Sequence, residues 1–172
     1  SANAVLLQFF TLVSYVMDGF AYAGESVGGH LVGAGSVERF RRLVGALFLW
    51  GTGLSLLFAL AYALGGTALI ALFTDDVAVR RAAETFLPYA VAIPPISMAG
   101  FLLDGLFVGT TATSGMLIGV ASAAAGFFTV HTLLPATLGN HALWIAFLTY
   151  LALRGIVQGL QLPGIVRRSF AL

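Results

Sequence analysis

The feature that most constrains this chain is the length of its stretches without formal charge. No Asp, Glu, Lys or Arg occurs from Gly105 to Leu153, and a second such stretch runs from Leu43 to Thr74. The chain is 59% hydrophobic and only 9% charged, whereas soluble domains carry about 25% charged residues. So little polar surface does not cover a soluble domain, but a surface that faces lipid needs none. The sequence therefore predicts an integral membrane protein.

Composition also argues against several classes of function. The net charge is +1, and none of the arginines clusters beside aromatic residues as a nucleic-acid groove requires, so we expect no nucleic-acid partner. The absence of cysteine removes disulfides, thiolate metal ligands and cysteine nucleophiles. No His/Glu spacing predicts a metal site, and no serine has a histidine and an acid beside it at a plausible membrane depth. We expect neither an enzyme nor a cofactor.

Five segments are long and apolar enough to cross a bilayer, which takes about 20 residues. They cover residues 2–25, 43–64, 86–108, 115–136 and 142–161. Residues 65–74 are too few for another crossing and predict an interfacial segment. The fold class is therefore an all-α membrane protein, a single polytopic bundle of about five helices. The chain begins at Ser1 with neither a Met nor a basic segment, so we expect a piece of a longer protein rather than a signal peptide.

Arginines predict the orientation, because short cytoplasmic loops retain basic residues. One side carries Arg39, Arg41, Arg42, Arg154, Arg167 and Arg168, whereas Arg80 and Arg81 lie on the other side among acidic residues. The chain is therefore expected to start outside and to end in the cytoplasm, in the inner (plasma) membrane. Arg154 falls one or two turns before the inner end of the last span, from where its side chain could reach the interface.

Two carboxylates lie inside apolar spans. Asp104 belongs to Phe101–Gly109, and Asp18 occupies a similar Asp-Gly step in the first span. An Asp in the middle of a membrane costs roughly 2.5–3.5 kcal/mol even on the mildest scales, so both should face protein or a wet cavity. The chemistry available to them is reversible protonation or the binding of a cation such as sodium. The alternative is a structural carboxylate that hydrogen-bonds neighbouring helices.

Polar residues at steps of three and four mark one face of three spans, and these faces predict a hydrated cavity. They are Gln8, Thr11, Tyr15, Asp18, Tyr22 and Glu25 in the first span, Ser97, Asp104 and Thr111 in the third, and Tyr150, Arg154, Gln158 and Gln161 in the last. Glu25 lies near the inner end, where solvation or pairing with the following arginines is the simpler interpretation. Trp144 lies where an interfacial aromatic belt is expected.

The third span also contains Pro88, Pro94 and Pro95. Proline leaves a backbone carbonyl without its usual donor and bends a helix. Asp104 follows Pro95 at about 13 Å along the helix. The combination predicts a bent helix with a buried carboxylate, which is typical of a moving, ion-sensitive element.

These segments together resemble a known family. The resemblance rests on the run from Asp18 to Gly35, on Trp50, on Phe101–Gly109, and on the Leu-Trp and Leu-Arg-Gly steps of the last span. They are similar to the multidrug and toxic compound extrusion (MATE) transporters, in particular the DNA-damage-inducible protein F (DinF) branch. The resemblance implies twelve helices in two lobes, of which this chain would supply helices eight to twelve.

The same resemblance implies a function. MATE transporters export cationic or amphipathic compounds, including drugs, in exchange for protons or sodium, and the acid of their tenth helix contributes to coupling. Asp104 matches that position, and Asp18 matches an acidic position of the DinF branch. The implied partners are the substrate, the lipid bilayer and the missing N-terminal lobe. Residues 110–114 lack the basic residue common there. A related transporter of lipid-linked substrates and a non-transporting membrane interaction protein are the alternatives.

Overall fold

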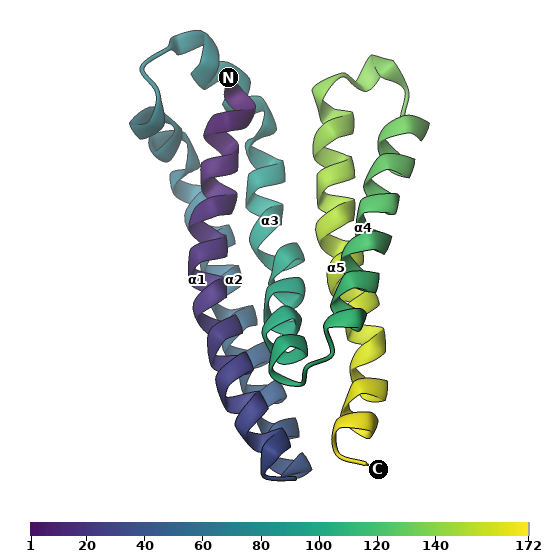
Figure 1. Cartoon of the computed structure of the whole chain (residues 1–172). Coiled ribbons are helices and arrows are strands. Elements are labelled where there is room, and N and C mark those ends of the chain that lie inside the picture. Colours follow the sequence, from purple (N-terminus) through teal and green to yellow (C-terminus); the bar gives the residue numbers. More distant parts are fainter. Residues whose placement is uncertain (172) are drawn as a thin grey trace.

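The computed structural model describes residues 1–171, and they form an all-α bundle (Figure 1). In order, the elements are α1 (Ala2–Gly33), α2 (Val37–Phe73), α3 (Val77–Gly109), α4 (Thr113–Leu133), the 3-10 turn η1 (Ala136–Leu138) and α5 (Asn140–Ser169). Within this range, five helices are long and apolar enough to span a membrane, which confirms the predicted fold class. The first residue lies at one end of the bundle and the C-terminal end at the other (Figure 1).

The helix α3 forms the centre of the bundle. It packs against α1 and α2 on one side and against α5 on the other, while α4 packs mainly against α5 (Figure 1). In the most apolar 18-residue segment of α3, 61% of the residues are buried, whereas the corresponding share in α2 is 17%. The helices around α3 thus present much of their apolar surface outward, as lipid-facing helices do.

Glycines allow α1 and α3 to approach each other closely. Gly105 and Gly109 of α3, one turn apart, lie against the backbone of Ala21 and Glu25 in α1, and a methyl group at Gly105 would collide with the Ala21 carbonyl. Gly29 of α1 lies in turn against the Gly109 carbonyl. Small residues at this spacing let membrane helices pack backbone to backbone.

Three helices extend beyond the predicted spans. Residues 65–74 do not form a separate interfacial segment, because α2 continues without interruption to Phe73. The helix that contains the predicted span 142–161, α5, continues through Pro163 to Ser169. The first span likewise continues to Gly33. In each case the sequence placed a boundary where apolar character weakens, whereas backbone hydrogen bonding carries the helix several turns further.

Specific residues end the helices. Gly35 adopts a left-handed φ of 65° just after α1, where a residue without a Cβ fits best. At the start of α3, the Asp76 carboxylate accepts hydrogen bonds from the backbone nitrogens of Ala78 (2.8 Å) and Val79 (3.2 Å). This cap satisfies two donors that the first turn of a helix would otherwise leave free.

Candidate functional site

The carboxylate of Asp104 lies between α3 and α5. Its side chain is 13% exposed and forms an ion pair with the Arg154 guanidinium. Gln158, one turn further along α5, donates a hydrogen bond from Nε2 to the other carboxylate oxygen at 2.6 Å. Both oxygens of Asp104 therefore have a donor from α5. The intramembrane carboxylate is stabilised by a guanidinium and an amide on the neighbouring helix.

Small and aromatic residues make room for the Arg154 side chain. The backbone at Gly100 leaves space beside the Arg154 methylenes, and a Cβ there would lie 3.4 Å from them. The guanidinium carbon lies 5.5 Å from the centroid of the Phe101 ring, within the range of a cation–π interaction. Arg154 thus reaches along the face of α3 past Gly100 and Phe101 to Asp104.

The network around Asp104 is not fully satisfied. Gln158 is 0% exposed, yet within residues 1–171 its Oε1 has no hydrogen-bond partner, and neither does Nε of Arg154. A buried donor and a buried acceptor without partners are costly, and such sites in proteins commonly hold water or a ligand group. The two atoms belong to residues one turn apart on the same helix.

Arg154 does not lie where the sequence predicted. Because α5 begins at Asn140 and ends at Ser169, Arg154 lies in the middle of the helix rather than near its inner end. Its side chain is 18% exposed and is held by Asp104. The prediction that it reaches for the interface is therefore wrong.

A ladder of contacts joins α1 to α5 at seven-residue intervals. Asn3 and Asn140 exchange two amide hydrogen bonds, each of 2.7 Å. Seven residues further along both helices, the rings of Phe10 and Phe147 meet edge to face at 5.4 Å between centroids. The next step along α5 is Arg154. The two helices therefore run in parallel and in register.

The same step along α1 reaches Met17, and the residue after it is Asp18. Asp18 is therefore at the depth of Arg154. From the α3 side, the backbone contact between Gly105 and Ala21 holds α3 beside this part of α1. The structure thus places Asp18, Asp104 and Arg154 at one level of the bundle, on three different helices.

Trp144 belongs to the first layer of this ladder. Its indole Nε1 donates to Oδ1 of Asn3 at 3.2 Å, and the side chain is 3% exposed. The prediction of an interfacial belt residue is wrong here, because the ring packs inside the bundle. Tyr89 and His141 add a hydrogen bond of 3.0 Å between α3 and α5 close by.

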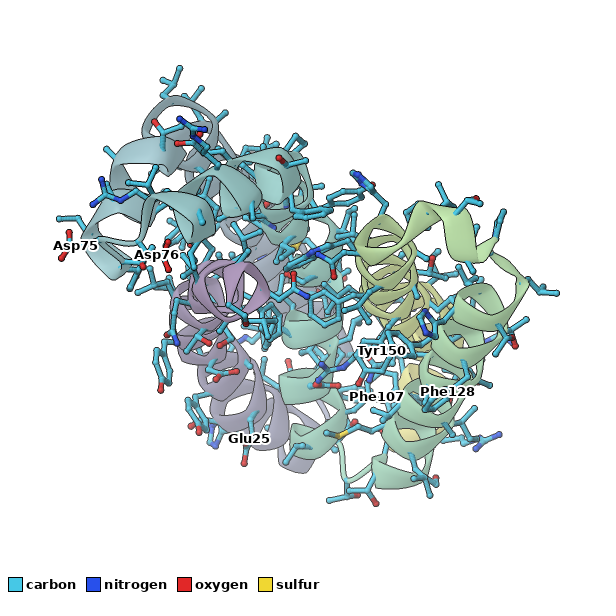
Figure 2. The ribbon with its side chains drawn as sticks, turned by 90° about the horizontal axis from the view of Figure 1, so that it is seen from above. Glu25, Asp75, Asp76, Phe107, Phe128 and Tyr150 are labelled. Atoms are coloured by element: carbon cyan, nitrogen blue, oxygen red, sulfur yellow. The ribbon has the colours of Figure 1, made fainter. Side chains whose placement is uncertain are left out.

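The polar face of α1 lies partly open. Gln8, Tyr15 and Tyr22 are exposed, and both tyrosines keep more than two thirds of their surface accessible. Thr11 is half-buried and donates to the Leu7 carbonyl of its own helix. Glu25 lies on the open side of α1 (Figure 2), and within the described residues it forms no ion pair with the arginines that follow.

Ser97 and Thr111, the other two residues predicted to line a cavity from the third span, do not lie at the level of Asp104. Ser97 is buried and its hydroxyl contacts the Pro94 carbonyl at 3.5 Å. Thr111 lies beyond the end of α3, in the turn to α4 with a φ of 55°. It lines a hollow of about 580 Å³ that also involves the C-terminal turns of α5. Figure 2 shows Phe107 and Tyr150 between α3 and the α4–α5 pair, on the inner side of the bundle.

Asp104 and the shared helix face of Arg154 and Gln158 were predicted from the sequence, but the binding of this face to Asp104 was not. The contact between Asn3 and Asn140 was not predicted either. The sequence does contain a pattern that indicates the Asn3–Asn140 contact. Asn3, Phe10 and Met17 repeat at the same seven-residue interval as Asn140, Phe147 and Arg154.

The MatE family model matches residues 1–134 of the chain, which include α1 to α4 and Asp104. This chain belongs to the MatE family. The MatE chain is 39% identical to the DNA damage-inducible protein F of Escherichia coli strain K12 over 170 residues, which are 99% of this chain and 36% of that protein.

A more distant relative of the MatE chain is Protein DETOXIFICATION 45, chloroplastic, of Arabidopsis thaliana. The two are 23% identical over 159 residues, which cover 90% of this chain and 28% of that protein. The chain therefore spans about a third of the length of the curated relatives it matches. No solved structure shows significant similarity to it. Family membership and five apolar helices together make this MatE chain a multi-pass membrane protein.

Proposed function

We propose that this chain is the C-terminal part of a cation-coupled antiporter that exports drugs or other amphipathic or cationic compounds. The observation that carries the proposal is a carboxylate, Asp104, held inside a membrane bundle of a MatE protein by side chains of a second helix. Ionisable residues within membrane spans mark ion or substrate pathways by default. The coupling ion is a proton or sodium.

The open polar face of α1 supports the same proposal. Exposed Gln8, Tyr15 and Tyr22 would be poorly placed against lipid tails, and they are better placed along an aqueous path. In a transporter of two lobes, this face lines the cavity between this part and the N-terminal lobe. Aromatic rings there suit substrates that are both apolar and cationic, which bind to the faces of such rings.

The decisive experiment compares Asp104→Asn with the unsubstituted complete transporter in proteoliposomes. Efflux of a fluorescent cation driven by a proton or sodium gradient should be lost in the variant, because Asn neither carries a charge nor exchanges a proton. Asp75→Asn, a change of the same kind in the exposed α2–α3 turn, should leave efflux unchanged. Gradient-driven efflux that survives Asp104→Asn would remove the coupling role.

One observation favours a second candidate, a membrane protein in which the carboxylate only joins helices. Asp104 is bonded to Arg154 and to Gln158, as a structural carboxylate would be. The same transport assay separates the candidates, because a structural protein shows no efflux that depends on a gradient.

We also propose that the chain lies in the inner (plasma) membrane, with its first residue outside and its C-terminal end in the cytoplasm. Because the chain has no cysteine, single cysteines placed in its turns report the orientation directly. A cysteine at Ser36, between α1 and α2, should be protected from an impermeant thiol reagent added to intact cells. A cysteine at Thr137 in η1 should react. The opposite pattern would reverse the orientation.

A further inference from the structure

The level of the bundle that contains Asp104 carries an odd number of charges. Asp104 on α3 and Asp18 on α1 are two carboxylates, and Arg154 on α5 is the only basic side chain at that level among the described residues. The helix α4, which packs against α5, has no Asp, Glu, Lys or Arg between Thr113 and Leu133. Glu25 lies about 10 Å further along α1 and faces the open side (Figure 2). With both carboxylates ionised, one negative charge stays uncompensated.

The Arg154 side chain pairs with one of the two carboxylates and lies at the depth of the other. It pairs with Asp104 in the structure, and Asp18 lies at the same depth on α1, in register with it through the Asn3–Asn140 and Phe10–Phe147 layers. The Arg154 Nε donor has no partner within residues 1–171, so the guanidinium does not use all its donors at Asp104. A guanidinium presents five donors in a fixed plane and serves two carboxylates readily.

An unmet acceptor lies at the same place. Oε1 of Gln158 is fully buried and without a partner in the described chain, one turn from Arg154 and beside Asp104. An amide oxygen next to a carboxylate suits a cation, because hard cations prefer oxygen ligands of this kind. The unpaired amide oxygen is therefore a second observation, independent of the charge count, that points to a bound positive group at this place.

We infer that Arg154 is a tethered cation shared by Asp104 and Asp18, and that this three-charge cluster binds one monovalent cation at a time. The inference rests on the proposed function and specifies it. When the coupling ion or a cationic substrate takes one carboxylate, Arg154 neutralises the other. The two kinds of cation compete because only one uncompensated charge exists. Arg154 thus acts as a positioning residue that sets how many cations the site accepts.

The test is to measure cation binding as a function of the charge of the cluster. The complete transporter is purified in detergent, and the binding of ²²Na⁺ and of radiolabelled tetraphenylphosphonium is measured separately at alkaline pH. Asp18→Asn and Asp104→Asn each remove the uncompensated charge, because Arg154 then neutralises the remaining carboxylate. Each should weaken binding by about tenfold or more. Sodium and tetraphenylphosphonium, where both bind, should displace each other.

The rescue variants distinguish this role from a structural one. Asp18→Asn combined with Arg154→Gln restores one uncompensated charge, and so does Asp104→Asn combined with Arg154→Gln. Binding should recover to within about threefold of the unsubstituted protein in both, because the effects of residues in one charge network are not additive. Arg154→Lys keeps the charge and should keep binding. Asp75→Asn, at the exposed turn, is the matched control and should change nothing.

Three outcomes would overturn the inference: unchanged binding in Asp18→Asn, double variants that bind no better than the single ones, or an unsubstituted transporter that binds neither probe cation. Gel-filtration profiles confirm that each variant is folded, and Asp18→Asn tests the role even where Arg154→Gln does not fold. Gradient-driven efflux is scored separately. If efflux requires Asp104 but cation binding does not follow the charge of the cluster, the shared role of Arg154 is refuted and the antiporter is not. If cation binding follows the charge but no variant or unsubstituted protein shows efflux, the antiporter is refuted.

Discussion

The chain contains two Arg–Asp pairs in opposite surroundings. Arg154 and Asp104 join α5 to α3 inside the bundle, with side chains 18% and 13% exposed, whereas Arg80 and Asp75 lie at the α2–α3 turn with side chains 33% and 106% exposed. In the first pair, each charge has lost most of its water and depends on the other. In the second, water solvates both groups and the attraction is weak. The same two residue types thus form an essential contact in one place and an optional one in the other.

The largest effect should follow from breaking the inner pair on one side only. Arg154→Gln leaves the Asp104 carboxylate buried beside a neutral amide and should lower the free energy of unfolding by about 3–5 kcal/mol. Thermal unfolding of the purified protein in detergent measures the change. Arg80→Gln is the matched control at the turn and should cost much less. Equal losses in the two variants would mean that burial does not distinguish the pairs.

The inner pair shows how far sequence reasoning extends. Long apolar runs with few charged residues located all five helices, because lipid strongly disfavours charge along a crossing helix. The same rule identified Asp104 as an exception. It did not identify the partner, because Arg154 lies fifty positions away along the chain and only the packing of α5 on α3 brings the two together. Its assignment near the interface also depended on a helix end that the structure places beyond Pro163.

The predicted helix ends and the predicted position of Trp144 differ from the structure for a related reason. Glycine is compatible both with a helix end and with close packing, and only the contact of Gly29 with Gly109 decides between the two. Trp144 has the position of a belt residue along its own helix. Its burial depends on Asn3, which is far away in sequence and accepts the indole hydrogen bond. Properties of single helices were therefore predictable, whereas contacts between helices were not.

A double substitution tests whether the inner pair is held by mutual dependence. Asp104→Asn with Arg154→Gln removes both charges, so no buried charge is left alone, and much of the stability lost in each single variant should return. The double-mutant cycle should give a coupling energy of about 2–3 kcal/mol. The corresponding cycle on Asp75 and Arg80 should give a much smaller coupling energy, because water screens the exposed pair. Additive losses at the inner pair would show that the two charges do not depend on each other.

Gln158 and Gln161 extend the comparison to the third member of the inner site. Gln158 is fully buried and donates to Asp104, whereas the Gln161 amide donates to the Val157 carbonyl of its own helix and is half-buried. Gln158→Leu removes a hydrogen bond to a charged group and should destabilise the protein by about 1.5–3 kcal/mol, reduced by the loss of an unpaired acceptor. Gln161→Leu should be close to neutral. Both are measured by the same unfolding assay, and a larger loss at Gln161 would contradict the site as described.

At the turn, the helix cap should matter more than the ion pair. The Asp76 carboxylate accepts from two backbone nitrogens at the start of α3, so Asp76→Ala should cost about 1 kcal/mol. Asp76→Asn retains a side-chain oxygen acceptor and should recover most of this loss. If Asn proves no better than Ala in thermal unfolding, the hydrogen bonds of the cap contribute nothing.

The smallest effect should come from Asp75→Asn. This substitution shows which contacts hold the Arg80 side chain in place. Besides the carboxylate, Arg80 donates to the Thr74 carbonyl at 2.7 Å and to the Ala71 carbonyl at 3.2 Å, both at the end of α2. Asp75→Asn leaves these bonds intact and removes only a solvated attraction, so the thermal unfolding midpoint should not change measurably at physiological salt concentration. Arg80→Gln removes the carbonyl contacts as well and should cost about 1 kcal/mol. A loss on Asp75→Asn as large as that on Arg80→Gln would show that the exposed pair, like the inner one, is held by charge. Burial would then not be the property that separates the two regions.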